Sequence, residues 1–111
     1  MARSIIQAYT EKYNRECFLC RLEAEKENRY YEPSDRERKA MHKHHFMHGT
    51  ANRRLAEQFG LWGYLCETHH ENLHEHSEYY QFLMQVAQGR FEKLYSHEKW
   101  MEVFGKNYLI M

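Results

Sequence analysis

Apolar positions recur with a helical period over the C-terminal third of the chain. A stripe between residues 78 and 95 fits one long helix in spite of Gly89, and its members are Phe82, Leu83, Val86, Phe91 and Leu94. A last short helix is expected around Trp100, Val103 and Phe104, and Gly105 should end it. The apolar residues of these two helices, among them Phe91, Trp100 and Phe104, are expected to pack against the rest of the protein; if exposed, they would favour a homodimer.

Helices are also expected nearer the N-terminus. Residues 5–13 could form a short helix, and residues 22–31 are rich in Glu, Lys, Arg and Ala, which are good helix formers. Pro33, followed by Ser34 and Asp35, marks a break before a second charged helix or turn.

The middle of the chain predicts two short strands. Residues 61–66, Leu-Trp-Gly-Tyr-Leu-Cys, are the best strand candidate, and a shorter strand-like run covers residues 44–47. Between the two runs, Thr50 is expected to cap a helix that Gly60 stops. After the second run, Thr68 is expected to cap a helix that carries several histidines.

Length and composition indicate one small domain. The chain has 111 residues, of which 29% are charged and 42% hydrophobic, so only a modest core can be buried. Three cysteines cannot form a fully paired disulfide framework, which makes a metal ion the natural cross-link. No run approaches the roughly 18 apolar residues of a membrane helix, and no signal peptide is apparent. We therefore expect a soluble cytoplasmic protein.

Charge is balanced overall but uneven along the chain. Lysine plus arginine equals aspartate plus glutamate, 16 each, so net charge argues neither for nor against a nucleic-acid partner. Between residues 36 and 54, however, Glu37 is the single acid, against Arg36, Arg38, Lys39, Lys43, Arg53 and Arg54. Such a stretch is typical both of a solvated basic face and of a surface that meets phosphate.

Two short pairs of metal-ligand residues lie far apart in sequence. The first is Cys17-Phe-Leu-Cys20 and the second is Cys66-Glu-Thr-His69. Two such pairs can close one tetrahedral zinc shell, and the second sits where a strand is expected to lead into a helix. The alternatives are buried small cysteines with a surface histidine, or a redox pair, although no βαβ pattern surrounds Cys17 and Cys20.

The histidines form a second set. Eight of the nine lie between His42 and His76. His70 and His74 are four apart on a predicted helix and should share one face, whereas His44 and His45 should point to opposite sides of a strand. One member of the strand pair can thus join the helix histidines around an ion, and the other can act as a base on water. The alternative is a histidine-rich surface.

These motifs resemble a known family. The order Cys-x-x-Cys, His-His on a strand, then Leu65-Cys66-x-x-His69-His70-x-x-x-His74 is similar to the HNH endonucleases, also called His-Me finger or ββα-metal nucleases, in their zinc-stapled form. It also resembles small phage-associated proteins with an HNH-type core. The resemblance covers residues 17–76.

The resemblance implies a role for each motif residue. His44, His70 and His74 would hold a catalytic divalent ion such as Mg²⁺ or Mn²⁺, and His45 would be the general base. A structural zinc would be held by Cys17, Cys20, Cys66 and His69, with His69 in place of the family's more usual fourth cysteine. The family commonly has an asparagine shortly before the Leu-Cys step that holds the base in position. Here that place is Leu-Trp-Gly-Tyr, and the nearest asparagine, Asn52, either substitutes or caps a turn.

Together these observations predict a single α+β domain over residues 1–111. A zinc-stabilised HNH-like core would occupy about 17–76, with a helical segment over about 78–111. The expected function is metal-dependent hydrolysis of DNA phosphodiester bonds, with Arg53 and Arg54 gripping phosphates unless they are only a solvated helix face. The alternatives are a non-catalytic zinc-stabilised module that binds nucleic acid or protein, and a metal protein whose histidines only buffer ions.

Overall fold

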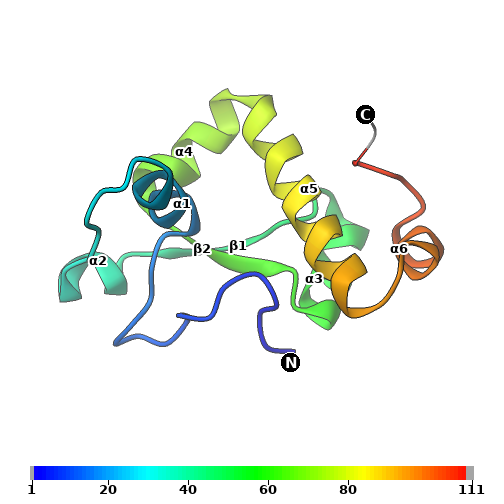
Figure 1. Cartoon of the computed structure of the whole chain (residues 1–111), viewed down its shortest axis with the longest axis horizontal. Coiled ribbons are helices and arrows are strands. Elements are labelled where there is room, and N and C mark those ends of the chain that lie inside the picture. Colours follow the sequence, from blue (N-terminus) through cyan, green and yellow to red (C-terminus); the bar gives the residue numbers. More distant parts are fainter. Residues whose placement is uncertain (1, 110–111) are drawn as a thin grey trace.

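Two antiparallel strands lie at the centre of the protein, with helices on several sides (Figure 1). The computed structural model describes residues 2–109, and it describes only the backbone of His74. The strands are β1 (His42–His45) and β2 (Trp62–Leu65). The helices of the described chain are α1 (Phe18–Lys26), α2 (Asp35–Lys39), α3 (Thr50–Phe59), α4 (Glu67–Glu75), α5 (Ser77–Leu94) and α6 (His97–Phe104). The predicted α+β class is confirmed.

The strand register fixes which residues face one another. His42 pairs with Leu65 and His45 pairs with Trp62, so the two strands are fully overlapped. Strand β1 begins two residues earlier than the predicted run, although Phe46 continues the ladder by donating its N–H to the Leu61 carbonyl at 2.9 Å. The element order β1, α3, β2, α4 brings the start of α4 beside the sheet.

The helices that follow the strands differ from expectation at their N-termini. Thr50 is the first residue of α3 rather than its cap, because the capping position is Gly49 and no side chain bonds the helix start there. Helix α3 ends as predicted at Gly60, whose φ of 73° lies in the left-handed region that favours glycine. Helix α4 is capped by Cys66 rather than by Thr68, because the Cys66 sulfur accepts the His69 N–H at the start of the helix.

The helix predicted over residues 5–13 is wrong. This segment runs on the other side of the strands from α4 and α5 in Figure 1, and it forms hydrogen bonds to β2 and to the residues just before β2 in place of helical ones. Ile5 donates its N–H to the Gly60 carbonyl at 2.8 Å, and the Ser4 hydroxyl donates to the Trp62 carbonyl. The side chain of Gln7 accepts from the Tyr64 N–H at 2.9 Å. These tertiary hydrogen bonds outweigh a weak helical preference.

Helix α1 starts earlier than predicted, and helix α2 lies where a second charged helix was predicted. Helix α1 begins at Phe18 rather than at residue 22 and ends at Lys26, and Asn28 beyond it adopts a positive φ of 54°. Helix α2 starts after Ser34, which forms a capping box with Glu37, so the predicted break and second charged helix are both confirmed.

The core is built around the sheet from residues of α1, α3, α4, α5 and α6. Its most deeply buried side chains include Phe46, Leu61, Leu65, Leu73, Leu83, Phe91 and Trp100. Helices α5 and α6 meet through aromatic rings, with Phe91 and Trp100 at 5.3 Å between ring centroids. The predicted packing is therefore confirmed for Leu83, Phe91 and Trp100, whereas Phe82 and Leu94 of the same predicted stripe are exposed. No helix in the described part of the chain has the length and apolarity to cross a membrane.

Candidate functional site

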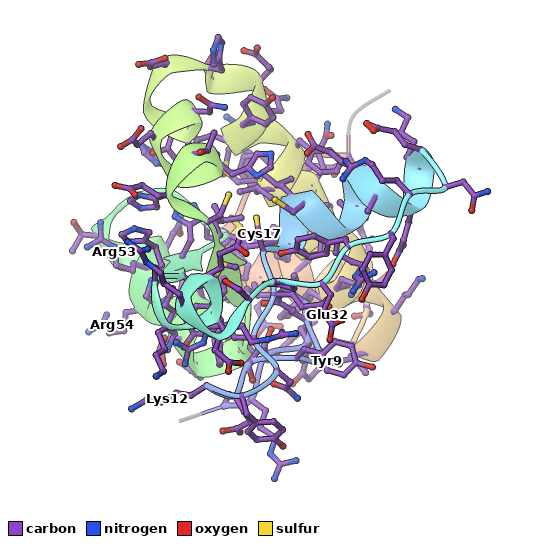
Figure 2. The ribbon with its side chains drawn as sticks, turned by 90° about the vertical axis from the view of Figure 1, so that its left-hand side faces the viewer. Tyr9, Lys12, Cys17, Glu32, Arg53 and Arg54 are labelled. Atoms are coloured by element: carbon purple, nitrogen blue, oxygen red, sulfur yellow. The ribbon has the colours of Figure 1, made fainter. Side chains whose placement is uncertain are left out.

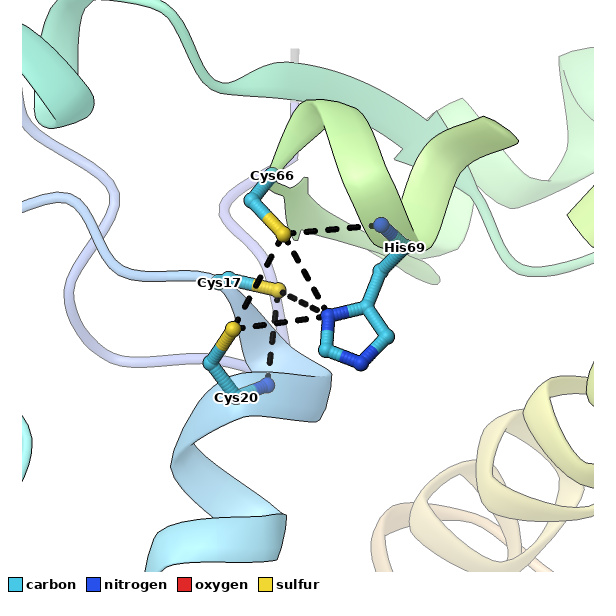
Figure 3. Close-up of side chains that lie close together, drawn as sticks. All are labelled: Cys17, Cys20, Cys66 and His69. Atoms are coloured by element: carbon cyan, nitrogen blue, oxygen red, sulfur yellow. Dashed lines mark hydrogen bonds between the residues drawn. The ribbon is translucent and has the colours of Figure 1, made fainter. Parts of the chain in front are cut away.

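Four predicted ligands come together at one end of the sheet. The ligand atoms of Cys17, Cys20, Cys66 and His69 all lie within 4.8 Å of one another. Figure 3 shows the three sulfurs around Nδ1 of the His69 ring. The group could therefore bind a metal ion such as zinc, as the spacing predicted.

The N-termini of α1 and α4 position these side chains. Cys17 is the N-cap of α1, and its sulfur accepts the Cys20 N–H at 3.4 Å. Cys66 is the N-cap of α4 in the same manner, and its sulfur accepts the His69 N–H at 3.5 Å. Each pair therefore folds as one helical turn, which turns a spacing of three residues into a short distance between ligand atoms.

The distances match a tetrahedral shell. Nδ1 of His69 lies 3.4 Å from the sulfurs of Cys17 and Cys20 and 3.3 Å from that of Cys66. The sulfurs of Cys20 and Cys66 are 3.8 Å apart. Tetrahedral zinc with Zn–S of about 2.3 Å and Zn–N of about 2.0–2.1 Å has sulfurs about 3.8 Å apart and sulfur about 3.6 Å from nitrogen. These four distances are within a few tenths of an ångström of this geometry.

The pKa shifts within the cluster are those expected of a site that favours a bound cation. A hydrogen bond with the Cys20 thiol lowers the pKa of Cys17 to about 4 against the opposing effect of burial. The same contact raises the pKa of Cys20, which burial raises further. The hydrogen bond to Cys17 also raises the pKa of His69 to about 9. Neighbouring thiolates repel each other, and bound protons reduce the negative charge of the cluster. A divalent ion in place of these protons would stabilise all three sulfurs as thiolates.

An acidic side chain supports the histidine ligand. Nε2 of His69, the ring nitrogen that faces away from the sulfurs, lies 3.2 Å from Oε1 of Glu23 on α1. A carboxylate on the outer nitrogen of a metal-binding histidine fixes its tautomer and makes the inner nitrogen a better ligand. Glu23 was not among the residues singled out from the sequence, because it lies 46 residues from His69 along the chain.

The second histidine set lines a separate hollow. The hollow has a volume of about 540 Å³ and lies between β1, α3, α4 and the start of α5. The residues that line it are Lys43, His44, His45, Met47, His48, Gly49, Arg53, His70 and Tyr80. The rings of His44 and His70 lie 6.0 Å apart between centroids, and the ring of His42 stacks on His70 at 4.6 Å. The side chain of the third predicted ligand of this set, His74, lies outside the described residues.

The predicted base has an unpredicted partner. Nε2 of His45 lies 2.6 Å from Oε2 of Glu57 on α3, and the other carboxylate oxygen of Glu57 accepts from Lys43 at 2.9 Å. Burial pushes the pKa of Glu57 upward, but the hydrogen bonds from Lys43 and His45 outweigh it and hold this pKa below its usual range. Asn52, by contrast, donates its side-chain amide to the His48 carbonyl at 2.9 Å, as expected for a residue that caps a turn.

The basic stretch is only partly a free surface. Arg38 is buried, donating to the Arg15 carbonyl at 2.9 Å, and Lys43 pairs with Glu57. Arg53 and Arg54 are exposed on α3, and both point outward along the left-hand edge of Figure 2. Only Arg53 of these two lines the histidine hollow.

Comparison of the chain with protein-family models, with curated proteins and with solved structures finds no match. The function is therefore inferred from the residues of the two sites themselves.

Proposed function

We propose that this protein is a metal-dependent endonuclease of HNH type that hydrolyses DNA phosphodiester bonds. The observation that carries the proposal is the hollow in which histidines of β1 and α4 meet. His44, His45 and His70 line the same depression, with Arg53 at its side. It is framed by two antiparallel strands followed by a helix, the element order that the sequence resemblance implies.

The donor set of the hollow suits a divalent ion. Two imidazoles that bind one ion at about 2.1 Å through ring nitrogens have centroids about 4.6 Å apart at a right angle and about 6.5 Å apart when they lie opposite each other across the ion. The separation of 6.0 Å between His44 and His70 lies between these values. We propose these two residues as ligands, with His74 as the third. When bound, the ion would polarise the phosphodiester and stabilise charge on the leaving 3′ oxygen.

The protein's own residues would then divide the remaining work. His45 removes a proton from a water molecule as the water oxygen bonds to phosphorus, and the bond from phosphorus to the 3′ oxygen breaks. The guanidinium of Arg53 binds a neighbouring phosphate and fixes the DNA strand along α3. The 3′ oxygen takes a proton from solvent and His45 returns its proton to solvent, so the products are a 5′-phosphate and a 3′-hydroxyl.

The cysteine centre has a different role in this proposal. A zinc ion on Cys17, Cys20, Cys66 and His69 completes a closed shell of four protein ligands, which is typical of structural rather than catalytic zinc. It would tie α1 to the start of α4. Because α4 also carries His70, the structural ion holds one wall of the hollow in place.

Plasmid nicking tests the proposal. Zinc-loaded protein is incubated with supercoiled plasmid in Mg²⁺, Mn²⁺, Ni²⁺ or EDTA, and the nicked and linear forms are quantified. Cleavage should require the added divalent ion, and His45→Ala should lower its rate by about 10²–10⁴-fold, as expected for loss of a general base. His97→Ala on α6, whose side chain is 51% exposed, is the matched control and should cut as the wild type does.

Two outcomes separate the alternatives. DNA binding without nicking in any metal would contradict the nuclease and favour a non-catalytic binding module. Equal cleavage by the wild type and by His45→Ala, each with full zinc content, would contradict the assignment of the base.

A further inference from the structure

The contact between His45 and Glu57 is short, and it joins two different elements. His45 lies on β1 and Glu57 on α3, with 2.6 Å between Nε2 and Oε2. Both side chains are largely covered, at 24% and 28% exposed. Lys43, two residues before His45, donates to the other oxygen of the same carboxylate at 2.9 Å. Both oxygens of the Glu57 carboxylate are therefore engaged in hydrogen bonds.

We propose that Glu57 is a positioning residue that holds His45 in the tautomer with its proton on Nε2. An ionised carboxylate can only accept hydrogen bonds, so the nitrogen facing it must carry the hydrogen. Nδ1 is then the basic atom of the neutral ring and the one able to take a proton from water. The inference rests on the proposed function, because it gives Glu57 a task only if His45 acts as a base.

The strand partner of His45 offers no acceptor for this task. The register partner of His45 on β2 is Trp62, and the Trp62 ring nitrogen donates to the Ala2 carbonyl at 3.3 Å. The face of the Trp62 ring lies 4.2 Å from the Lys43 ammonium. The acceptor for His45 comes instead from α3.

Helix α3 combines two roles on one face. Arg53 and Glu57 are four residues apart, so their side chains project from the same side of the helix. Arg53 lines the hollow and Glu57 contacts the base that lines it. A DNA strand bound by Arg53 would thus be positioned by the same rigid helix that orients His45.

Nitrogen NMR tests the tautomer without reference to activity. Zinc-loaded protein labelled with ¹⁵N is studied at slightly alkaline pH, where two-bond ¹⁵N–¹H correlations distinguish the two neutral tautomers of each histidine. Wild-type His45 should show the pattern of a ring protonated at Nε2. Glu57→Gln should reverse it, because Lys43 selects the amide oxygen and turns the amide N–H groups toward His45. In the double variant Lys43→Met, Glu57→Gln, no ammonium group fixes the amide oxygen. The amide can then turn its oxygen toward His45, which should restore the wild-type pattern.

Cleavage kinetics tests the consequence for catalysis. Glu57→Ala and Glu57→Gln should lower kcat by about 10–100-fold, as is common when the support of an active-site histidine is lost, and change KM less than twofold. The double variant should recover kcat relative to Glu57→Gln, with Lys43→Met alone as its reference. Gln58→Ala, an exposed neighbour on α3, should change neither the tautomer nor kcat.

The possible failures are distinguishable. An unchanged tautomer in Glu57→Gln, or an unchanged kcat in Glu57→Ala while His45→Ala is inactive, would overturn the inference and leave the nuclease proposal standing. A wild-type protein that cuts no DNA would overturn the nuclease and the catalytic role of Glu57 together. A reduced melting temperature with wild-type kcat and tautomer would make Glu57 a purely structural residue.

Discussion

Removal of the metal from the cysteine centre is expected to destabilise the whole domain. An ion bound there would join α1 to the start of α4 across the 46 residues that separate Cys20 and Cys66. In the chain-entropy description of a cross-link, closing a loop of this length stabilises the folded state by about 4 kcal/mol. Small domains have a net free energy of unfolding of only about 5–15 kcal/mol, so the cross-link supplies a large share of it.

Calorimetry of the zinc-loaded and chelated proteins measures this contribution. At about 4 °C per kcal/mol for a domain near 100 residues, the loss should lower Tm by about 15 °C or more. Cys66→Ser should behave like the chelated protein, because serine keeps the helix cap of α4 while the sulfur ligand is lost. His97→Ala should keep the wild-type Tm and one bound zinc per chain.

Two measurements would contradict this assignment of the metal centre. If the purified protein contains no zinc by elemental analysis and melts at the same temperature with and without chelator, the four residues do not form a structural metal centre. If Cys66→Ser still binds one zinc with unchanged affinity, Cys66 is not one of the four ligands.

Three further changes test other parts of the structure. Gly60→Ala should destabilise the protein by at least about 1–2 kcal/mol in urea unfolding, because Gly60 has a φ of 73° and an added Cβ would lie 2.0 Å from the Arg3 carbonyl oxygen. An unchanged urea midpoint would contradict the close approach of the N-terminal segment to Gly60. Glu23→Gln should weaken zinc binding by about 10–100-fold in chelator competition, because His69 loses its carboxylate partner; equal affinity would show that the contact does not support the ligand. Trp100→Ala should cost about 3–5 kcal/mol by the same urea assay, because a fully buried ring leaves a cavity; a cost under about 1 kcal/mol would contradict its burial in a well-packed core.

The cysteine centre could be predicted from the sequence because each half of it is local. A pair spaced by three residues becomes a ligand pair as soon as one helical turn forms, and that turn depends only on neighbouring backbone. The long helix α5 was equally predictable, since its apolar stripe is a property of one segment. Only the meeting of the two halves needed tertiary structure.

The contacts that the sequence did not reveal join distant segments through polar groups. The N-terminal segment contains helix-compatible residues, yet Gln7 bonds Tyr64 and the Glu16 carbonyl instead of a helical neighbour. Glu57 lies 12 residues from His45, and nothing in its own helix distinguishes it from a surface acid. Such partners are set by the packing of α3 on β1, which no periodicity encodes.

Helix α4 gives the two sites a common mechanical basis. His69 and His70 are consecutive on this helix, so their side chains leave it about 100° apart. One turns to the sulfurs of the cysteine centre and the other to the hollow that also holds His44. Because Cys66 both caps the helix and belongs to the centre, a bound ion would fix the start of α4 and its rotation about its axis. The direction of His70 toward His44 would then depend on the metal at the other site, and loss of zinc should disturb the hollow even where the histidines themselves are unchanged.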